Sequence, residues 1–206
     1  MIVAAEGPSA AGKTTWCRTI VAEFVAEYTP TGLEPNRSDP DTQARYWTEV
    51  NVDRWAQAIA LERRTGVAVC DSDPLKLHYS WSLARIGEAP VARFLRELAA
   101  VREAMSRREI GFADAVFLTL PDEAVLRRQK DGDAMRSRRA FELHVRLRDP
   151  LEEWYRTLDR LRPGTVGWEL PPTGADHMVT ALQPDGRYNI EVLDALASQL
   201  PSTGRR

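Results

Sequence analysis

The sequence GPSAAGKT at residues 7–14 decides the fold, and it follows a short apolar run, IVAA, at residues 2–5. The eight residues satisfy the pattern G-x-x-x-x-G-K-[S/T], which is typical of phosphate-binding loops when a strand precedes it and a helix follows. Both conditions are met, because the apolar run predicts a strand and helical spacing begins at Thr14. The apolar positions on one face of this predicted helix are Trp16, Ile20, Phe24 and Tyr28. We therefore predict a phosphate-binding loop (P-loop) at residues 7–14.

The residue types in this loop suit the phosphates of a nucleotide. Glycines allow the backbone to curl until successive N–H groups point inward at an anion, and the following helix adds the positive end of its dipole. Lys13 can then reach the β- and γ-phosphates as a catalytic cation, while the Thr14 hydroxyl is placed to bind Mg²⁺. The alternative is a chance glycine turn with a surface lysine, and the flanking elements argue against it. The predicted nucleotide-binding residues are Gly7, Ser9, Ala10, Ala11, Gly12, Lys13, Thr14 and Thr15.

Length and charge limit the remaining choices. A chain of 206 residues fits one α/β domain spanning residues 1–206. The formal net charge of -2 predicts no general attraction to nucleic acid or membranes, so we expect a small molecule as partner. No run of about 18 apolar residues is present, and the N-terminus lacks the basic region of a signal peptide. The two cysteines, Cys17 and Cys70, fit a reducing compartment, which predicts a cytoplasmic protein. The oligomeric state stays open, with a homodimer among the alternatives.

Short apolar runs alternate with helical patterns along the chain. Further strands are predicted at residues 67–70, 115–120 and 165–170, with a brief one leading to Glu34. Helices are predicted at residues 41–65, 75–86, 91–108, from 121 to the turn at 131–133, 150–161 and 190–200. Strands that alternate with helices of this length predict a mostly parallel sheet with helices on both faces.

Three further segments resemble the thymidylate kinase and deoxynucleoside kinase group. They are GVAVCDSDPLKLHYSWSLARIG (66–87), ADAVFLTLPDEAVLRRQKDGDAMRSRRAFELHVR (113–146) and the pair Glu34-Pro35. With the P-loop, the resemblance covers most of the chain up to about residue 160. It implies a three-layer α/β P-loop NTPase fold with a five-stranded, mostly parallel sheet, helices on both faces and an arginine-bearing lid at about residues 127–148. It also implies ATP as the phosphoryl donor and an acceptor held over the carboxyl ends of the strands.

Three acidic residues are candidates for the chemistry. Asp71 ends an apolar strand, where a carboxylate can hold Mg²⁺ or orient the acceptor, and Asp73 is a candidate acceptor ligand. Both have a structural alternative, because they precede a helix that starts with Pro74 and are therefore suited to capping it. If the Glu-Pro match holds, Glu34 accepts a hydrogen bond from the acceptor hydroxyl and acts as general base. The alternative for Glu34 is a loop glutamate.

Basic and aromatic residues supply the remaining candidates. Five arginines flank the turn at residues 131–133: Arg127, Arg128, Arg136, Arg138 and Arg139. Guanidinium groups there can stabilise charge on the transferring phosphoryl group, with Arg136 and Arg139 as the catalytic candidates, and the alternative is a solvated helix face. The resemblance suggests that Arg128 stacks on adenine instead. Trp47 offers a flat surface for an acceptor ring, although aromatic residues at helical spacing are more often core.

Departures from the resembled group bear on the acceptor. Leu33 and Ser72 stand where thymidylate kinases are expected to carry arginines, and a monophosphate acceptor needs such cations. We therefore predict an ATP-dependent kinase that phosphorylates a hydroxyl of a nucleoside-like acceptor. A nucleoside monophosphate kinase remains an alternative, with substrate-binding cations drawn from Arg37, Arg45 and Arg54. The sequence is also compatible with an antibiotic O-phosphotransferase of the chloramphenicol type, a regulatory P-loop NTPase and a nucleotide-binding structural module.

Overall fold

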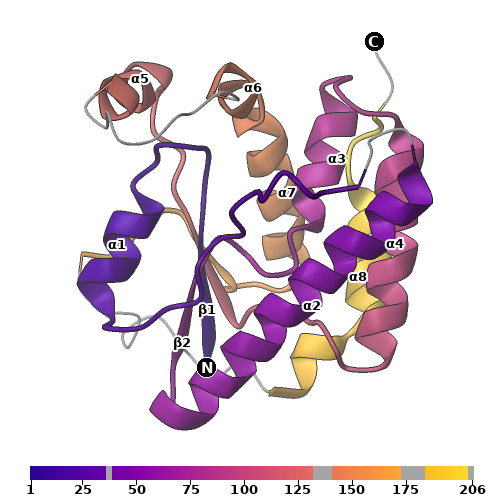
Figure 1. Cartoon of the computed structure of the whole chain (residues 1–206), viewed down its shortest axis with the longest axis horizontal. Helices are drawn as coiled ribbons and strands as arrows, with labels where there is room; N and C mark the ends of the chain where they lie inside the picture. Colours follow the sequence, from indigo (N-terminus) through magenta and orange to yellow (C-terminus); the bar gives the residue numbers. More distant parts are fainter. Residues whose placement is uncertain (36–38, 132–140, 173–183, 204–206) are drawn as a thin grey trace.

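A parallel sheet forms the centre of the molecule. The computed structural model describes residues 1–35, 39–131, 141–172 and 184–203. The strands stand in the order β2-β1-β3-β4, all paired in parallel. Their bounds are β1 (Ile2–Glu6), β2 (Ala68–Asp71), β3 (Ala115–Leu118) and β4 (Val166–Gly167). Because parallel strands end at the same edge, the residues that follow β1, β2 and β3 are brought together there, at the top of Figure 1.

The two faces of the sheet carry cores of different size. Val3 and Ala5 of β1 point to one face, where Trp16 and Cys17 of α1 (Lys13–Ile20) cover them. Ile2 and Ala4, which alternate with them, join the larger core on the other face. Helices on that side include α2 (Pro40–Thr65), α3 (Leu77–Arg85), α4 (Val91–Ser106), α7 (Arg148–Leu161) and α8 (Ile190–Gln199) (Figure 1). The predicted α/β class with helices on both faces is confirmed.

Helix α2 shows how closely local signals fix its ends. Asp39 caps its N-terminus, because the carboxylate accepts hydrogen bonds from the backbone N–H groups of Asp41 and Thr42. Pro40 occupies the first turn, and Gly66 ends the helix in the left-handed conformation with φ 80°. The prediction of a helix at 41–65 with a stop at Gly66 is thus confirmed.

The region after α1 differs from the prediction. The helix ends at Ile20, and Val25 forms a parallel bridge with Cys70 at the outer edge of β2. In the described part of the chain the sheet therefore has four strands plus this single bridge, rather than five full strands. The brief strand expected before Glu34 is also misplaced, because the extended segment lies at Val25. Apolar spacing over a short stretch does not separate a helix from a buried strand.

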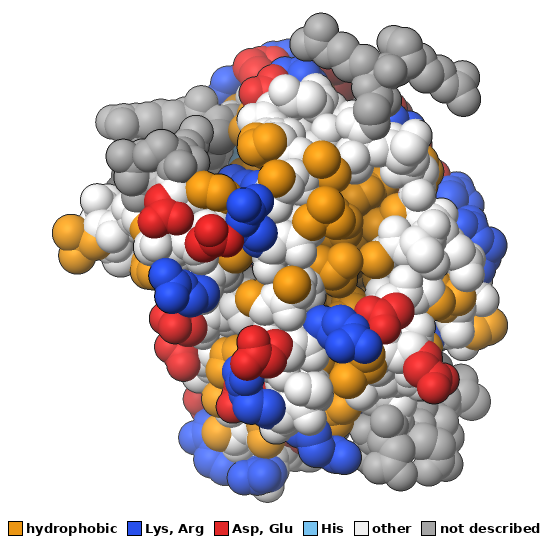
Figure 2. All heavy atoms as spheres, turned by 90° about the vertical axis from the view of Figure 1, so that its right-hand side faces the viewer, with side chains coloured by type: hydrophobic (Ala, Val, Ile, Leu, Met, Phe, Trp, Pro, Cys, Tyr) orange, Lys and Arg blue, Asp and Glu red, His pale blue; other side chains and the backbone are white. Residues whose placement is uncertain are grey.

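Two short helices, α5 (Glu123–Asp131) and α6 (Phe141–Arg146), stand above the carboxyl edge of the sheet (Figure 1). They belong to the predicted lid, whose residues 132–140 lie outside the described ranges. Seen from the side, the helical face carries an upright band of hydrophobic side chains (Figure 2). Val91 and Leu95 of α4 are among the large hydrophobic residues exposed to solvent. None of the helices described is both long enough and apolar enough to cross a membrane.

Candidate active site

The P-loop has the backbone that its glycines allow. Gly7 has φ 153°, and a Cβ added there would lie 2.3 Å from the carbonyl oxygen of Thr119. Gly12 has φ 84° and leads directly into α1. Lys13 is buried, with its ammonium donating hydrogen bonds to the carbonyl oxygens of Gly7 (2.8 Å) and Pro8 (3.3 Å). The lysine therefore lies along the inside of the loop, next to the N–H groups at the start of the helix.

Thr14 and Asp71 form the oxygen-rich pair that the sequence predicted near the loop. Thr14 Oγ1 donates a hydrogen bond of 2.5 Å to Asp71 Oδ2. The other oxygen, Oδ1, is buried and has no hydrogen-bond partner among the residues described. Burial raises the pKa of Asp71, whereas the Thr14 hydrogen bond and the Lys13 charge act to lower it. A buried, unsatisfied carboxylate oxygen beside a hydroxyl fits the hard oxygen ligands that Mg²⁺ prefers.

No group of three or more potential His, Cys, Asp or Glu ligands occurs in the described ranges. An ion held by Thr14 and Asp71 would therefore take its other ligands from phosphate oxygens and water, as is usual for Mg²⁺ bound with a nucleotide.

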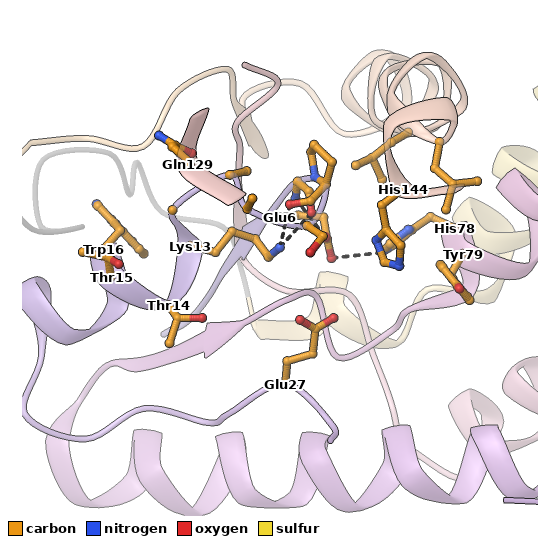
Figure 3. A pocket seen from close by; sticks show the side chains of 18 of the residues that line it. Glu6, Lys13, Thr14, Thr15, Trp16, Glu27, His78, Tyr79, Gln129 and His144 are labelled. Carbon is orange, nitrogen blue, oxygen red and sulfur yellow. Dashed lines mark hydrogen bonds and ion pairs between the residues drawn. The ribbon is translucent and has the colours of Figure 1, made fainter. Parts of the chain in front are cut away.

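A cavity of about 900 Å³ runs from the P-loop across the carboxyl edge of the sheet (Figure 3). This volume suits a small-molecule site. Near the loop its walls include residues 7–16, Arg18, Thr19 and Gln129. We call the opposite part the acceptor end, and its walls are Glu27, Lys76, His78, Tyr79, Ser82, His144, Leu147 and Leu151.

Glu27 is the carboxylate that the acceptor end presents to the cavity. It follows the Val25 bridge by two residues, and Figure 3 shows its carboxylate pointing into the cavity. Its side chain is 43% exposed and accepts a 2.9 Å hydrogen bond from Lys76 Nζ. Partial burial acts to raise the pKa of Glu27, but the charges of Lys76 and Lys13 prevail and lower it to about 2. Glu27 is therefore ionised at neutral pH.

Glu6 ties the P-loop to the segment after β2. This carboxylate is 2% exposed and accepts hydrogen bonds from Gly7 N (2.8 Å), Ser72 Oγ (2.7 Å) and Asp73 N (3.0 Å). His78 Nε2 lies 3.1 Å from it (Figure 3). Burial acts to raise the pKa of Glu6, yet the neighbouring Lys76 and His78 hold it well below the usual value. The buried charge thus links two loops that meet at the cavity.

Glu34 does not reach the cavity, which corrects its expected place as general base. Its Oε1 accepts hydrogen bonds from Tyr28 Oη (2.8 Å) and Thr31 N (2.6 Å), and Oε2 accepts one from Gly32 N. The hydrogen bond from Tyr28, followed by that from Thr31 N, lowers the pKa of Glu34 to about 2. The carboxylate stabilises its own loop, so the structure agrees with the loop alternative.

Asp73 and Arg54, expected to contact the acceptor, are instead buried supports of the wall. Asp73 accepts hydrogen bonds from Leu75 N at Oδ1 and from Tyr155 Oη (2.9 Å) at Oδ2, so both oxygens are occupied. Arg54 donates hydrogen bonds to four backbone carbonyls, those of Ala26, Asp71, Ser72 and Asp73. It links the Val25 segment to the end of β2 and does not line the cavity.

The other candidates lie away from the cavity or outside the described residues. Arg45 is exposed on α2 near Thr42, and Trp47 packs edge-on against Tyr28 and Tyr46. Arg128 is exposed on α5 and does not line the cavity. Four candidate cations fall outside the described ranges: Arg37, Arg136, Arg138 and Arg139.

Sequence reasoning missed Glu6, Glu27 and Lys76. A charged residue at the end of an apolar strand, directly before Gly7, was an available signal for Glu6. Glu27 carried no such signal, because the helical apolar spacing continued through it to Tyr28.

Comparisons with known proteins bear on the fold. The sequence matches no family model and no curated protein. Two solved structures of deoxyadenosine kinase from M. mycoides match in three dimensions. The structure with bound dATP has a TM-score of 0.58 and 13% identity, covering 82% of this chain and 91% of that one. The structure with the products dCMP and a flexible dCDP has a TM-score of 0.54 and 11% identity, covering 97% and 98%.

This chain has the fold of a P-loop deoxynucleoside kinase. The fold resemblance expected from the sequence is therefore confirmed. Sequence identities of 13% and 11% are too low to transfer the role of any single residue, so the roles below rest on the geometry of this chain.

Proposed function

We propose that this protein is an ATP-dependent kinase that transfers the γ-phosphoryl group to a hydroxyl of a nucleoside-like small molecule. One observation carries the proposal: a single cavity joins the P-loop, where Lys13 and the Asp71-bonded Thr14 line it, to the ionised carboxylate of Glu27. A site for a phosphoryl donor and a group that can orient a hydroxyl thus open into the same space. The deoxyadenosine kinase fold supports this arrangement.

At the P-loop, backbone N–H groups and the start of α1 bind the phosphates of ATP. Lys13 leaves the carbonyls of Gly7 and Pro8 and neutralises charge that grows on the bridging and γ-oxygens during transfer. Thr14 and Asp71 would hold Mg²⁺, which when bound offsets phosphate charge and orients the β- and γ-phosphates. These residues position and stabilise, and they form no covalent intermediate.

At the acceptor end, Glu27 accepts a hydrogen bond from the acceptor hydroxyl and aims its oxygen at the γ-phosphorus. The bond from this oxygen to phosphorus forms as the bond to the β,γ-bridging oxygen breaks and ADP leaves. The hydroxyl proton passes to Glu27 and then to water. Because its pKa is low, Glu27 takes the proton late, when the attacking oxygen already carries positive charge.

The charges at the acceptor end favour an uncharged acceptor over a monophosphate. Glu6 and Glu27 place two carboxylates around one lysine, Lys76, whose charge they already neutralise. Of the three compensating cations considered for a nucleotide acceptor, Arg45 and Arg54 do not line the cavity, and Arg37 lies outside the described residues. A phosphate there would meet net negative charge close to the γ-phosphate of ATP, and repulsion is strong in a water-poor site.

The test is ATP labelled in the γ-phosphate, incubated with Mg²⁺ and a panel of nucleosides, nucleoside monophosphates, sugars and phenicol antibiotics. We expect label to pass to at least one nucleoside and ATP turnover to rise with that acceptor. Release of inorganic phosphate that no acceptor stimulates would contradict the proposal and indicate a regulatory NTPase. Labelling of a phenicol alone would indicate the antibiotic phosphotransferase.

A further inference from the structure

Lys76 occupies an unusual position between the P-loop and the acceptor end. Its ammonium lies 2.9 Å from Glu27 Oε1, contacts Ser72 Oγ, and lies 3.7 Å from Glu6 Oε2. An ammonium has three N–H donors, and three protein oxygens face them here. Although Lys76 lines the cavity and is 23% exposed, binding a substrate phosphate would require it to give up one of these partners.

The backbone at Lys76 is held in a costly conformation. The residue has φ 47° and directly precedes α3, in the left-handed region that a side chain disfavours by about 1–2 kcal/mol. Backbone bonds on both sides keep it there, from Lys76 N to Asp73 O (3.2 Å) and from Tyr79 N to Lys76 O (3.0 Å). Such conformations persist where the surroundings fix them, and they are common at functional sites. This turn directs the lysine toward Glu27.

Glu27, in contrast, lies on an irregular segment and is 43% exposed. Within the described part of the chain, the hydrogen bond to its carboxylate comes from Lys76. Lys76 is itself anchored to Glu6, which is buried and fixed by the backbone of the P-loop and of the segment after β2. The contacts therefore connect Glu6, which is buried and held by backbone N–H groups, through Lys76 to the partly exposed Glu27.

We propose that Lys76 is a positioning residue for phosphoryl transfer, which holds the Glu27 carboxylate against the cavity in the orientation that receives the acceptor hydroxyl. This inference rests on the proposed function. Without Lys76, Glu27 loses its hydrogen bond and is repelled by the carboxylate of Glu6. A small misplacement of the group that orients a nucleophile costs about 100-fold in rate.

Removal of Lys76 also changes the charge that Glu27 experiences. The charged groups whose fields act on Glu27 are Lys76 before α3, Lys13 on α1, Glu6 on β1, Asp71 on β2 and His144 on α6. With Lys76 gone, the carboxylates outnumber Lys13, so the pKa of Glu27 rises from about 2 toward or above the ordinary glutamate value of about 4.3. Glu27 works in its ionised form, so this change removes activity from the acidic side of the pH profile.

The experiment compares Lys76→Met and Lys76→Arg with wild-type protein, using ATP and the best nucleoside from the acceptor panel. Arg102→Met is the matched control, because it removes a cation from an exposed ion pair with Asp194 on the far surface. Steady-state kinetics at pH 5–8 are measured with circular dichroism and ATP binding. We expect Lys76→Met to lower kcat about 10- to 100-fold at pH 7.5. We expect a further decline toward pH 5 that wild type lacks, partial recovery in Lys76→Arg, and unchanged ATP binding.

Three results would overturn the inference. A loss in Lys76→Met that is the same at every pH, with no recovery in Lys76→Arg, would indicate a merely structural lysine. A rise in acceptor KM with kcat unchanged would indicate that Lys76 binds the acceptor directly. If Lys76→Met does not fold, Lys76→Gln takes its place in the same comparison. If the wild-type protein transfers phosphate to no hydroxyl, the proposed function itself is wrong. If transfer is unaffected in Lys76→Met, only this inference is wrong.

Discussion

The two ends of the cavity are built in different ways. The P-loop end is built mainly from one continuous segment, residues 7–14, whose backbone N–H groups and Lys13 form the proposed phosphate site. The acceptor end is assembled from separate segments: Glu27 after the Val25 bridge, Lys76 before α3, and His144 on α6. A local motif can specify the first kind of site, whereas only the folded chain specifies the second.

This difference has an energetic side. At the P-loop the site depends mainly on backbone conformation: a Cβ at Gly7 would meet the Thr119 carbonyl oxygen, and the positive φ of Gly12 disfavours a side chain. At the acceptor end the arrangement depends on paired charges, because Lys76 lies between the carboxylates of Glu6 and Glu27. Substitutions at the two ends should therefore differ in their effects on transfer and on stability.

Lys13→Met should have the largest effect. The side chain keeps its apolar stem but loses the charge that stabilises the transferring phosphoryl group, so kcat should fall by about 1,000-fold. Lys13 makes its hydrogen bonds within its own loop, so the melting temperature should change little. Single-turnover transfer and thermal unfolding measure the two. Near-normal transfer would mean that the P-loop is not the donor site.

Glu27→Gln compared with Glu34→Gln tests whether geometry or motif identifies the base. Glu27→Gln should lower kcat by about 100-fold, because the amide orients the hydroxyl poorly and cannot accept its proton. Glu34→Gln should leave kcat within about twofold, since that carboxylate bonds to Tyr28 and Thr31 outside the cavity. The measurement is kcat for the same acceptor in both variants, and the reverse order would restore Glu34 as the base.

Arg54→Met compared with Arg45→Met sharpens the distinction between support and substrate binding. Arg54 is buried and donates to four carbonyls, so its loss leaves buried acceptors unpaired and should lower the free energy of unfolding by about 2 kcal/mol. Arg45 is exposed, and its replacement should change stability by less than about 0.5 kcal/mol. Urea unfolding gives both values. An Arg54 variant that kept full stability but lost affinity for a monophosphate would revive the nucleotide kinase alternative.

Ala10→Gly should have the smallest effect. Ala10 has φ 71°, where glycine is not disfavoured, so the substitution relieves strain while adding freedom to the unfolded chain. The balance should be a gain in stability of at most about 1 kcal/mol, measured by thermal unfolding. A clear loss of stability would show that the Ala10 methyl makes contacts that outweigh the strain.

The success of sequence reasoning followed the same division between the two ends. The sequence predicted the P-loop and the ends of α2 because each depends on residues close together in the chain, such as Asp39 and Gly66 at the ends of α2. It also predicted that Asp71 lies near Thr14, because Asp71 stands at the end of an apolar strand. The α/β class followed from the alternation of apolar runs with helical patterns.

The acceptor end was not accessible in this way. Val25 pairs with Cys70, which is far away in the sequence, and the helical spacing of the residues around Val25 gave no sign of this bridge. Because the extended segment lies at Val25, the carboxylate that follows it is Glu27 and not Glu34. Arg54 was predicted as a candidate substrate-binding cation, but in the fold it donates to the carbonyls of Ala26 and of residues 71–73. Contacts between backbone groups that are far apart in the sequence produce no local sequence pattern from which they could be predicted.

In the proposed reaction the γ-phosphoryl group passes from ATP at the P-loop to an uncharged hydroxyl held beside Glu27. The most direct measurement is kcat/KM for a deoxynucleoside against its own 5′-monophosphate, with γ-labelled ATP and with Glu27→Gln as control. We expect labelled monophosphate as the product and loss of transfer in the control. We also expect a preference for the nucleoside of at least about tenfold, because repulsion opposes the charged acceptor. A preference for the monophosphate, or equal transfer by Glu27→Gln, would contradict the proposed reaction.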